Sequence, residues 1–202
     1  MQWISGRLPV PHILHYEKQG GEEFLLLSEI KGKDAKNASL MKEHPVKFGQ
    51  IMAETLLSVH QLNILDCLFD ASLDKKLAKA KMRVEMGLVD SDDFDPERRH
   101  QTAIELLREA ECNRPDESLD DRVFTHGDYT PANNMLHENK VTGIIDWGRA
   151  GAADRHQDIA LMLRSLRRHA GLAAANSFID TYGRHKIDFS KLDYYILLDE
   201  LF

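Results

Sequence analysis

Residues 126–133 read HGDYTPAN, and residues 144–148 read IIDWG. Transfer of a phosphoryl group from a nucleotide needs a carboxylate at the attacking hydroxyl and oxygen ligands that hold magnesium at the phosphates. Kinases supply these groups with His-x-Asp-x-x-x-x-Asn, followed along the chain by Asp-x-Gly. Asp128 and Asn133 have the first spacing, and Asp146 begins the second motif. The two motifs predict a kinase-like phosphotransferase, with Asp128 as catalytic base and Asn133 and Asp146 as Mg²⁺ ligands.

Short strands are predicted around both motifs, because apolar runs there are separated by turn-forming residues. Asp146 follows an apolar run directly, as expected for a metal ligand at the exit of a strand. The predicted strands cover residues 122–126, 134–137 and 141–146.

Helices are predicted on both sides of this strand cluster. A long helix follows Pro45, where Phe48, Met52, Leu56 and Val59 recur at helical spacing. The sequence therefore predicts an α+β fold in which helices surround a small group of strands. Further helices are predicted at residues 73–86, at 98–111, around Ile159 to Leu166, and at the C-terminal KLDYYILLDELF.

The N-terminal part of the chain differs in pattern from the rest. Residues 7–12 (RLPVPH) contain two prolines and are predicted to form a linker. Residues 24–30 (FLLLSEI) are predicted to form a short buried strand that ends at the turn-like KGKD.

Composition limits the function classes that the chain can belong to. With 43% hydrophobic and 29% charged residues, it is typical of a globular protein. A net charge of −7 argues against a nucleic-acid partner and is compatible with a cationic substrate. The two cysteines, Cys67 and Cys112, form no metal or redox motif. No signal peptide and no apolar run of membrane-spanning length is present, so we expect a cytoplasmic protein without a membrane partner.

At this point the sequence resembles a known family. THGDYTPANNML, GIIDWGRAGAADRHQDIAL and YYILLDELF are similar to the aminoglycoside phosphotransferases, specifically the bacterial aminoglycoside 3′-phosphotransferases. RVEMGLVDSDDFDPE and WISGRLPVPHILHYE resemble the same enzymes. The resemblance implies a protein-kinase-like fold and an ATP-dependent transferase. Such an enzyme moves the γ-phosphate to the 3′ hydroxyl of an aminoglycoside antibiotic and confers resistance.

The resemblance also implies roles for individual residues. Asp128 matches the family's catalytic base, and Asn133 and Asp146 match its Mg²⁺ ligands. Ser28 and Ile30 match the hinge, whose backbone holds the adenine of ATP. His169 stands where some relatives carry an acidic residue. The substrate-binding residues implied are Asp93, Asp95, Arg149, Arg164, Asp199, Glu200 and Phe202 with its terminal carboxylate.

The resemblance starts partway into the family pattern. We therefore expect residues 1–30 to be a remnant of a truncated N-terminal lobe plus the hinge strand, and residues 31–202 to form the C-terminal catalytic and substrate-binding lobe. The family's phosphate-covering loop and its phosphate-gripping lysine have no counterpart in residues 1–60. A fragment, a mis-called start and a decayed gene product are all compatible with this pattern.

Two alternatives stay open at the level of sequence. One is a kinase of the same fold for another small alcohol, such as choline or a macrolide. A choline kinase would be expected to carry an aromatic cage, and no such cage is evident. The other is a truncated lobe without catalytic activity. The sequence leaves the oligomeric state and the choice between ATP and GTP undetermined.

Overall fold

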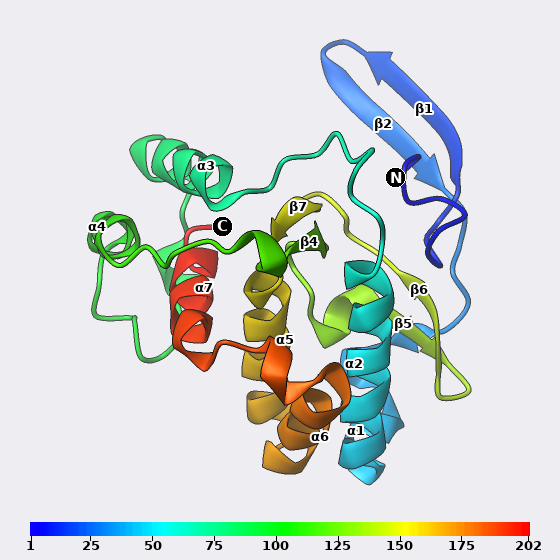
Figure 1. Ribbon diagram of the computed structural model, residues 1–202. Coiled ribbons are helices and arrows are strands. Elements are labelled where there is room, and N and C mark those ends of the chain that lie inside the picture. The colour runs from blue at the N-terminus through cyan, green and yellow to red at the C-terminus, as the bar shows by residue number, and fades with distance from the viewer.

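A computed structural model describes all 202 residues. Seven α-helices form most of the main body, and seven short strands complete the fold (Figure 1). None of the helices combines the length and the apolar composition needed to cross a membrane. The helices are α1 (Ser39–Glu43), α2 (Pro45–His60), α3 (Leu73–Glu85), α4 (Ala103–Cys112), α5 (His156–His169), α6 (Leu172–Tyr182) and α7 (Leu192–Asp199).

The strands form three small antiparallel sheets rather than one large sheet. One is a hairpin of β1 and β2, one has the order β3-β5-β6, and one pairs β4 with β7. The strands are β1 (Ile13–Gln19), β2 (Glu22–Leu27), β3 (Lys33–Asp34), β4 (Arg122–Thr125), β5 (Asn134–His137), β6 (Lys140–Ile144) and β7 (Gly151–Asp154).

The core lies where α2, α5, α6 and α7 meet. Phe48, Met52 and Leu56 are fully buried on one face of α2, as their helical spacing predicts. Gly49 lets α2 approach α6 closely, because a Cβ at this position would lie 2.2 Å from the carbonyl oxygen of Ala174. The catalytic loop rests on this core, because the buried Tyr129 hydroxyl donates to the main-chain oxygen of Met52 (2.9 Å).

The first ten residues pack on the main body. Ile4, Leu8 and Val10 are buried in the common core, and the Trp3 ring lies 4.7 Å from that of Phe124. The predicted linker at residues 7–12 therefore contributes core side chains. The predicted division of the chain at residue 30 stays a prediction.

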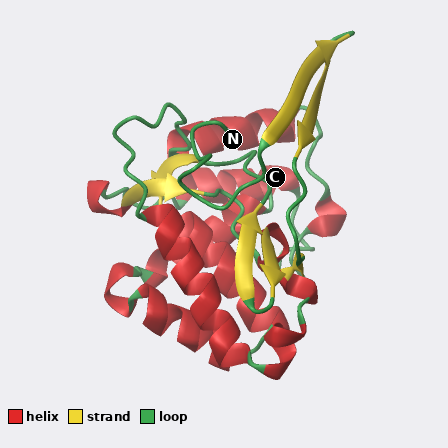
Figure 2. Ribbon diagram, turned by 90° about the vertical axis from the view of Figure 1, so that its right-hand side faces the viewer, coloured by secondary structure: helices red, strands yellow, loops and turns green.

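The β1–β2 hairpin projects away from the main body (Figures 1 and 2). The sequence prediction of a buried strand at residues 24–30 is wrong in its burial and its end. The strand ends at Leu27, and Phe24 is 51% exposed. The reason is that β2 pairs with β1 alone, so neither face of the hairpin is covered.

Two further elements differ from their prediction. The helix expected at residues 98–111 begins at Ala103, because Thr102 and Glu105 form a capping box that fixes its start. Strand β7 was not predicted, because its sequence GAAD has low strand propensity. Pairing with β4 and burial hold it in the extended form.

Candidate active site

Buried hydrogen bonds fix the loop that carries Asp128. Gly127 has φ of +85°, and a Cβ there would lie 2.2 Å from the carbonyl oxygen of Arg149, so this position requires glycine. The Asp158 carboxylate accepts hydrogen bonds from the N–H groups of His126 (2.7 Å) and Gly127 (2.8 Å). Asp158 thus orders the catalytic loop.

Asp158 is itself held by a buried histidine. His60 Nε2 lies 3.0 Å from Asp158 Oδ2, and both side chains are buried. Burial alone would raise the pKa of Asp158, but the hydrogen bonds from His60 and from the N–H of His126 outweigh it and hold the pKa below its ordinary value. The carboxylate therefore stays ionised while it holds the loop.

His126 connects the two sequence motifs. Its Nδ1 accepts a hydrogen bond from the N–H of Asp128 (3.3 Å), so Nε2 carries the proton and donates to the carbonyl oxygen of Ile145 (2.8 Å). His126 therefore positions the catalytic loop beside the segment that carries Asp146.

Asp128 and Asn133 are in direct contact. Asn133 Nδ2 donates to the Asp128 carboxylate (3.1 Å) and to its main-chain oxygen (2.8 Å). Burial, followed by the charge of Asp199, raises the pKa of Asp128, while the Arg149 guanidinium opposes this shift. A raised pKa makes the carboxylate a stronger proton acceptor than a solvated aspartate.

Asp146 lies two residues beyond the end of β6, in a strained conformation. Its φ of +61° is uncommon for a residue other than glycine. Its carboxylate is exposed, and neither it nor Asn133 Oδ1 accepts a hydrogen bond. Ile145 N–H bonds the main-chain oxygen of Asn133 (2.9 Å), which ties the two segments together. The free amide and carboxylate oxygens are hard donors of the kind that fit magnesium.

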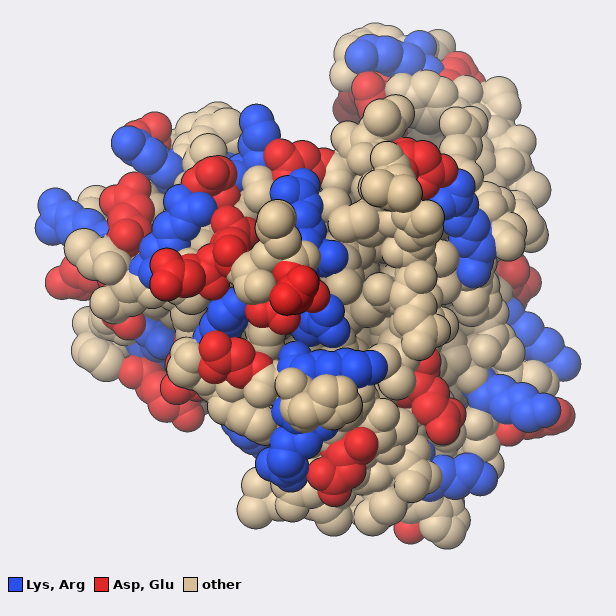
Figure 3. Space-filling model, in the orientation of Figure 1, with Lys and Arg blue, Asp and Glu red and all other residues tan.

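A charged cavity of about 390 Å³ opens on one side of Asp128. Charged side chains are dense over the part of the surface that carries α3 and α4 (Figure 3). The cavity brings together all the substrate-binding residues predicted from the sequence. Asp93, Asp95, Arg149, Arg164, Asp199, Glu200 and Phe202 all line it with Asp128.

Arginines already occupy two of these carboxylates. Asp199 lies between Arg149 (3.0 Å) and Arg164 (2.6 Å). Asp95 pairs with Arg168 and, more distantly, with Arg164 (3.5 Å). Arg168 was not predicted, although it lies one helical turn after Arg164 and so faces the same cavity. The ion pairs hold the carboxylates at fixed positions around the cavity wall.

Two other carboxylates keep oxygen atoms without a hydrogen-bonding partner. Glu200 Oε2 accepts from the N–H of Asp95 (2.8 Å), whereas its buried Oε1 accepts no hydrogen bond and forms only a long ion pair with Arg164 (3.6 Å). Burial and the neighbouring Asp95 charge raise the pKa of Glu200 to about 7. Asp93 is exposed and forms no ion pair. The exposed Asp93 is therefore available to a cationic ligand, whereas Glu200 adds buried negative charge beside Arg164.

Phe202 closes the cavity at the C-terminal end of the chain. Its main-chain oxygen accepts from Arg83 (2.9 Å), and the Arg149 guanidinium lies 5.1 Å from the centre of its ring. These contacts fix the last turn after α7 and so the position of Glu200.

A second cavity, of about 600 Å³ and mostly apolar, lies between the hairpin and the main body. Ser28, Ile30 and Asp146 line it together with Leu27 and Trp147. The carbonyl of Ser28 and the N–H and carbonyl of Ile30 form no hydrogen bond within the protein. Free backbone groups two residues apart beside an apolar cavity can hold a flat ring that has both a donor and an acceptor on its edge.

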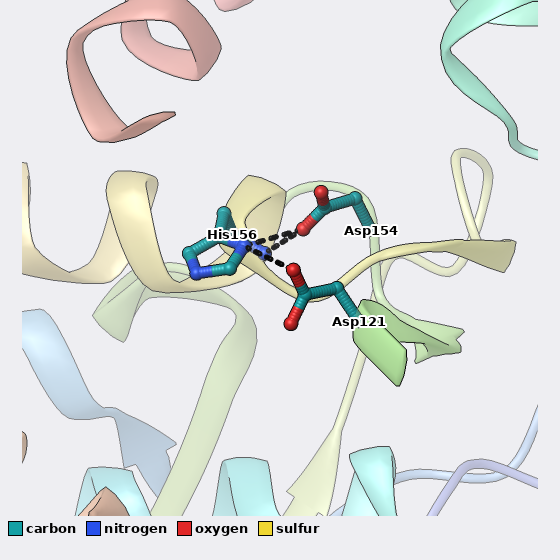
Figure 4. A group of neighbouring side chains, drawn as sticks. All are labelled: Asp121, Asp154 and His156. Carbon is teal, nitrogen blue, oxygen red and sulfur yellow. Dashed lines mark hydrogen bonds and ion pairs between the residues drawn. The ribbon is translucent and has the colours of Figure 1, made fainter. Parts of the chain in front are cut away.

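A third group of titratable side chains lies away from both cavities. Asp121, Asp154 and His156 come close together between β4 and the start of α5 (Figure 4). His156 donates to Asp154 (2.6 Å), and the Lys191 ammonium bonds Asp154 (2.9 Å) and Asp121 (3.0 Å). Because His156 and Lys191 already donate to both oxygens of Asp154 and to one of Asp121, the cluster's geometry is that of a structural network.

Comparisons with known proteins identify relatives along the whole chain. Residues 1–195 match the family described as "Phosphotransferase enzyme family". An aminoglycoside 3′-phosphotransferase of Niallia circulans is 40% identical over 203 residues, which are 100% of this chain and 76% of the relative. One of Enterococcus faecalis is 37% identical over 205 residues, with the same coverage.

Solved structures agree with these relatives. An aminoglycoside 3′-phosphotransferase of type VIII superposes with a TM-score of 0.90 at 33% identity, covering 100% of this chain and 77% of the solved one. An aminoglycoside phosphotransferase of Streptomyces rimosus, in complex with ADP and streptomycin, gives 0.89 at 27% identity, covering 99% and 78%. The α+β kinase-like fold and the phosphotransferase class predicted from sequence are confirmed.

Proposed function

The chain belongs to the phosphotransferase enzyme family, and we propose that it transfers the γ-phosphate of ATP to the 3′ hydroxyl of aminoglycosides. The observation that carries this proposal is the position of Asp128. Its carboxylate lines the charged cavity, which suits a polycationic sugar. The adjoining Asp146 lines the apolar cavity, which suits a nucleotide base.

Asp128 acts as the base in this proposal. It accepts the proton of the sugar hydroxyl as the hydroxyl oxygen bonds to the γ-phosphorus and the bond from that phosphorus to ADP breaks. Its raised pKa supports the role, as does the hydrogen bond from Asn133 that fixes the carboxylate in place.

Asn133 Oδ1 and the Asp146 carboxylate would hold Mg²⁺. When bound, the ion would offset negative charge on the phosphates. Support comes from the two hard oxygen donors that the protein leaves without a partner, on segments joined by the Ile145 to Asn133 hydrogen bond.

The nucleotide would enter beside the hairpin. The carbonyl of Ser28 and the N–H of Ile30 are free to bond the adenine edge, and the apolar walls would cover its faces. ADP in the Streptomyces rimosus relative supports a nucleotide in this family. The proposal extends to the predicted division of the chain, with the hinge at residues 28–30.

The aminoglycoside would bind in the charged cavity. Asp93 would receive one of its ammonium groups, and Glu200 would add negative charge from the wall beside Arg164. The pairs of Arg149 and Arg164 with Asp199 would fix the wall that the drug contacts. The alternative of a choline-like kinase is disfavoured, because Phe202 is the one aromatic side chain in the lining and a quaternary amine calls for an aromatic cage.

Product analysis tests the proposal. The protein is incubated with ATP, Mg²⁺ and kanamycin, and the product is examined by mass spectrometry and ³¹P NMR. The expected result is one added phosphate on the 3′ oxygen, absent with the Asp128→Asn variant. A phosphate at another hydroxyl, or equal turnover by the variant, would overturn it.

A further inference from the structure

A small cavity of about 160 Å³ lies between the charged cavity and the apolar one. It shares Arg149 and Phe202 with the charged cavity and Gly148 with the apolar one. The cavity therefore lies next to the place where the phosphoryl group would be transferred. The function proposed above assigns it no ligand.

Cations dominate the lining of this small cavity. Lys75, Lys76 and Lys79 come from α3, and Arg149 comes from the segment after the second motif. Asp70 is the one carboxylate, and its Oδ1 already accepts from the N–H of Ser72 (3.0 Å) and lies 3.6 Å from Arg122. The cavity thus has an excess of positive charge.

Lys76 is unusual among these cations because it is buried without a hydrogen-bonding partner. The residue is 8% exposed, and its Nζ donates no hydrogen bond. The Phe202 ring makes a cation–π contact with its ammonium, with the ring centre 5.3 Å from Nζ. Lys79, Arg83 and Arg149 crowd the same ring.

An ammonium has three donors, and burying it without acceptors is costly. Lys76 nevertheless remains largely charged near neutral pH. Burial lowers its pKa to about 8 and Arg149 also lowers it, while the carboxylates of Asp199, Asp158 and Asp128 oppose the shift. Its surroundings therefore include the predicted catalytic base, yet no carboxylate makes contact with it.

We propose that Lys76, together with Arg149 and Lys79, forms a binding site for a phosphate oxyanion beside Asp128. A phosphate has several acceptor oxygens and negative charge, which match the unused donors of Lys76 and the excess charge of the lining. The ligand is either free inorganic phosphate or the phosphoryl group of the phosphorylated product. The second source rests on the proposed function, whereas the site itself does not.

Titration with inorganic phosphate tests the site. Binding is followed by calorimetry at constant ionic strength and pH 7, for the unmodified protein and for Lys76→Met. We expect binding in the millimolar range and at least about a tenfold loss of affinity with Lys76→Met, since charge-assisted bonds are strong. Lys79→Met, at the exposed rim, should lose less. Thermal unfolding of each variant verifies that it is folded.

Lys81→Met is the matched control, because Lys81 lies on the same helix, is exposed and does not line the cavity. Its phosphate affinity should match that of the unmodified protein. The site is refuted if Lys76→Met and Lys81→Met bind phosphate equally, or if the unmodified protein shows no binding up to about 100 mM phosphate, well beyond the millimolar range expected for weak sites.

A second arm identifies the source of the phosphate. Kanamycin and its 3′-phosphorylated form are each titrated into the unmodified protein and Lys76→Met. If the transferred phosphoryl group occupies the site, the variant loses affinity for the phosphorylated form alone. If free phosphate is the ligand, the variant loses affinity for inorganic phosphate and binds both drug forms as tightly as the unmodified protein does. If the proposed function is wrong, the variant and the unmodified protein should not differ in affinity for the phosphorylated drug. The inorganic phosphate titration would still test the site by itself.

Discussion

The two large cavities beside the catalytic loop differ in almost every physical respect. One is lined by carboxylates and arginines from the acidic loop (residues 90–95), α5 and the C-terminus. The other is lined mainly by apolar side chains from the hairpin and from the segments around β5 and Asp146. The difference indicates that the two substrates are selected by different forces, namely screened ionic attraction on one side and burial of apolar surface on the other.

Asp128 should affect the rate of phosphoryl transfer and leave the affinity of both cavities for their ligands nearly unchanged. Asp128→Asn should lower kcat about 10²- to 10⁴-fold, the range for loss of a general base. The KM of each substrate should change less than about threefold, because the lost interaction belongs to the transition state. Steady-state kinetics on both substrates is the measurement, and Asp116→Asn, an exposed aspartate, is the control. A variant that retains more than about a tenth of kcat contradicts the role.

Salt should separate the two cavities. Between about 0.05 and 0.5 M salt, the affinity for kanamycin should fall about tenfold or more, since several partly exposed charge pairs are screened together. Binding of adenosine, which is uncharged, should stay nearly constant. Calorimetric titrations of both ligands check this. If kanamycin affinity does not respond to salt, the carboxylates of the acidic loop are solvated and do not bind the drug.

The charged cavity should also respond to pH. Glu200 has a pKa raised to about 7, so it gains full charge only above neutrality. A cationic ligand favours the ionised form, and kanamycin affinity should therefore rise a few-fold as pH increases from about 6 to 7.5. Glu200→Gln should flatten this rise. An unchanged pH profile in Glu200→Gln would exclude Glu200 as its source.

The smallest expected effect concerns stability. The pKa of Asp128 is raised in the folded protein, so its contribution to stability is fully present below the unfolded pKa and is lost as pH rises through the folded pKa. Asp128→Asn removes the cost of keeping an ionised carboxylate buried at pH 7, and it should raise Tm by about 1–3 °C at that pH. The gain should vanish below about pH 4. Calorimetric melting of both proteins at pH 7 and below pH 4 tests this expectation. A variant with a lower Tm than the unmodified protein at pH 7 would contradict it.

Sequence reasoning recovered what local spacing encodes. The positions of Asp128, Asn133 and Asp146 follow from two short motifs, and the helix after Pro45 follows from its apolar period. The residues of the charged cavity came from the family resemblance, and the structure places all of them in one cavity.

What the sequence could not supply are contacts between distant segments. The pairing of Arg168 with Asp95 and the lack of a partner for Lys76 depend on how α3, α5 and the C-terminus meet. The apolar run FLLL of the hairpin is typical of a buried strand, yet burial depends on what covers it, and that is a property of packing.

The central claim is that each cavity serves one substrate, and two single substitutions measured side by side test it most directly. Asp93→Asn removes a charge without freeing an arginine, because Asp93 has no ion pair. Leu27→Ser makes the apolar wall polar. We expect the first to raise KM for kanamycin by about three- to tenfold and the second to do so for ATP, each leaving the other KM within about twofold. If either variant raises both KM values equally, the division of the site between two cavities is wrong.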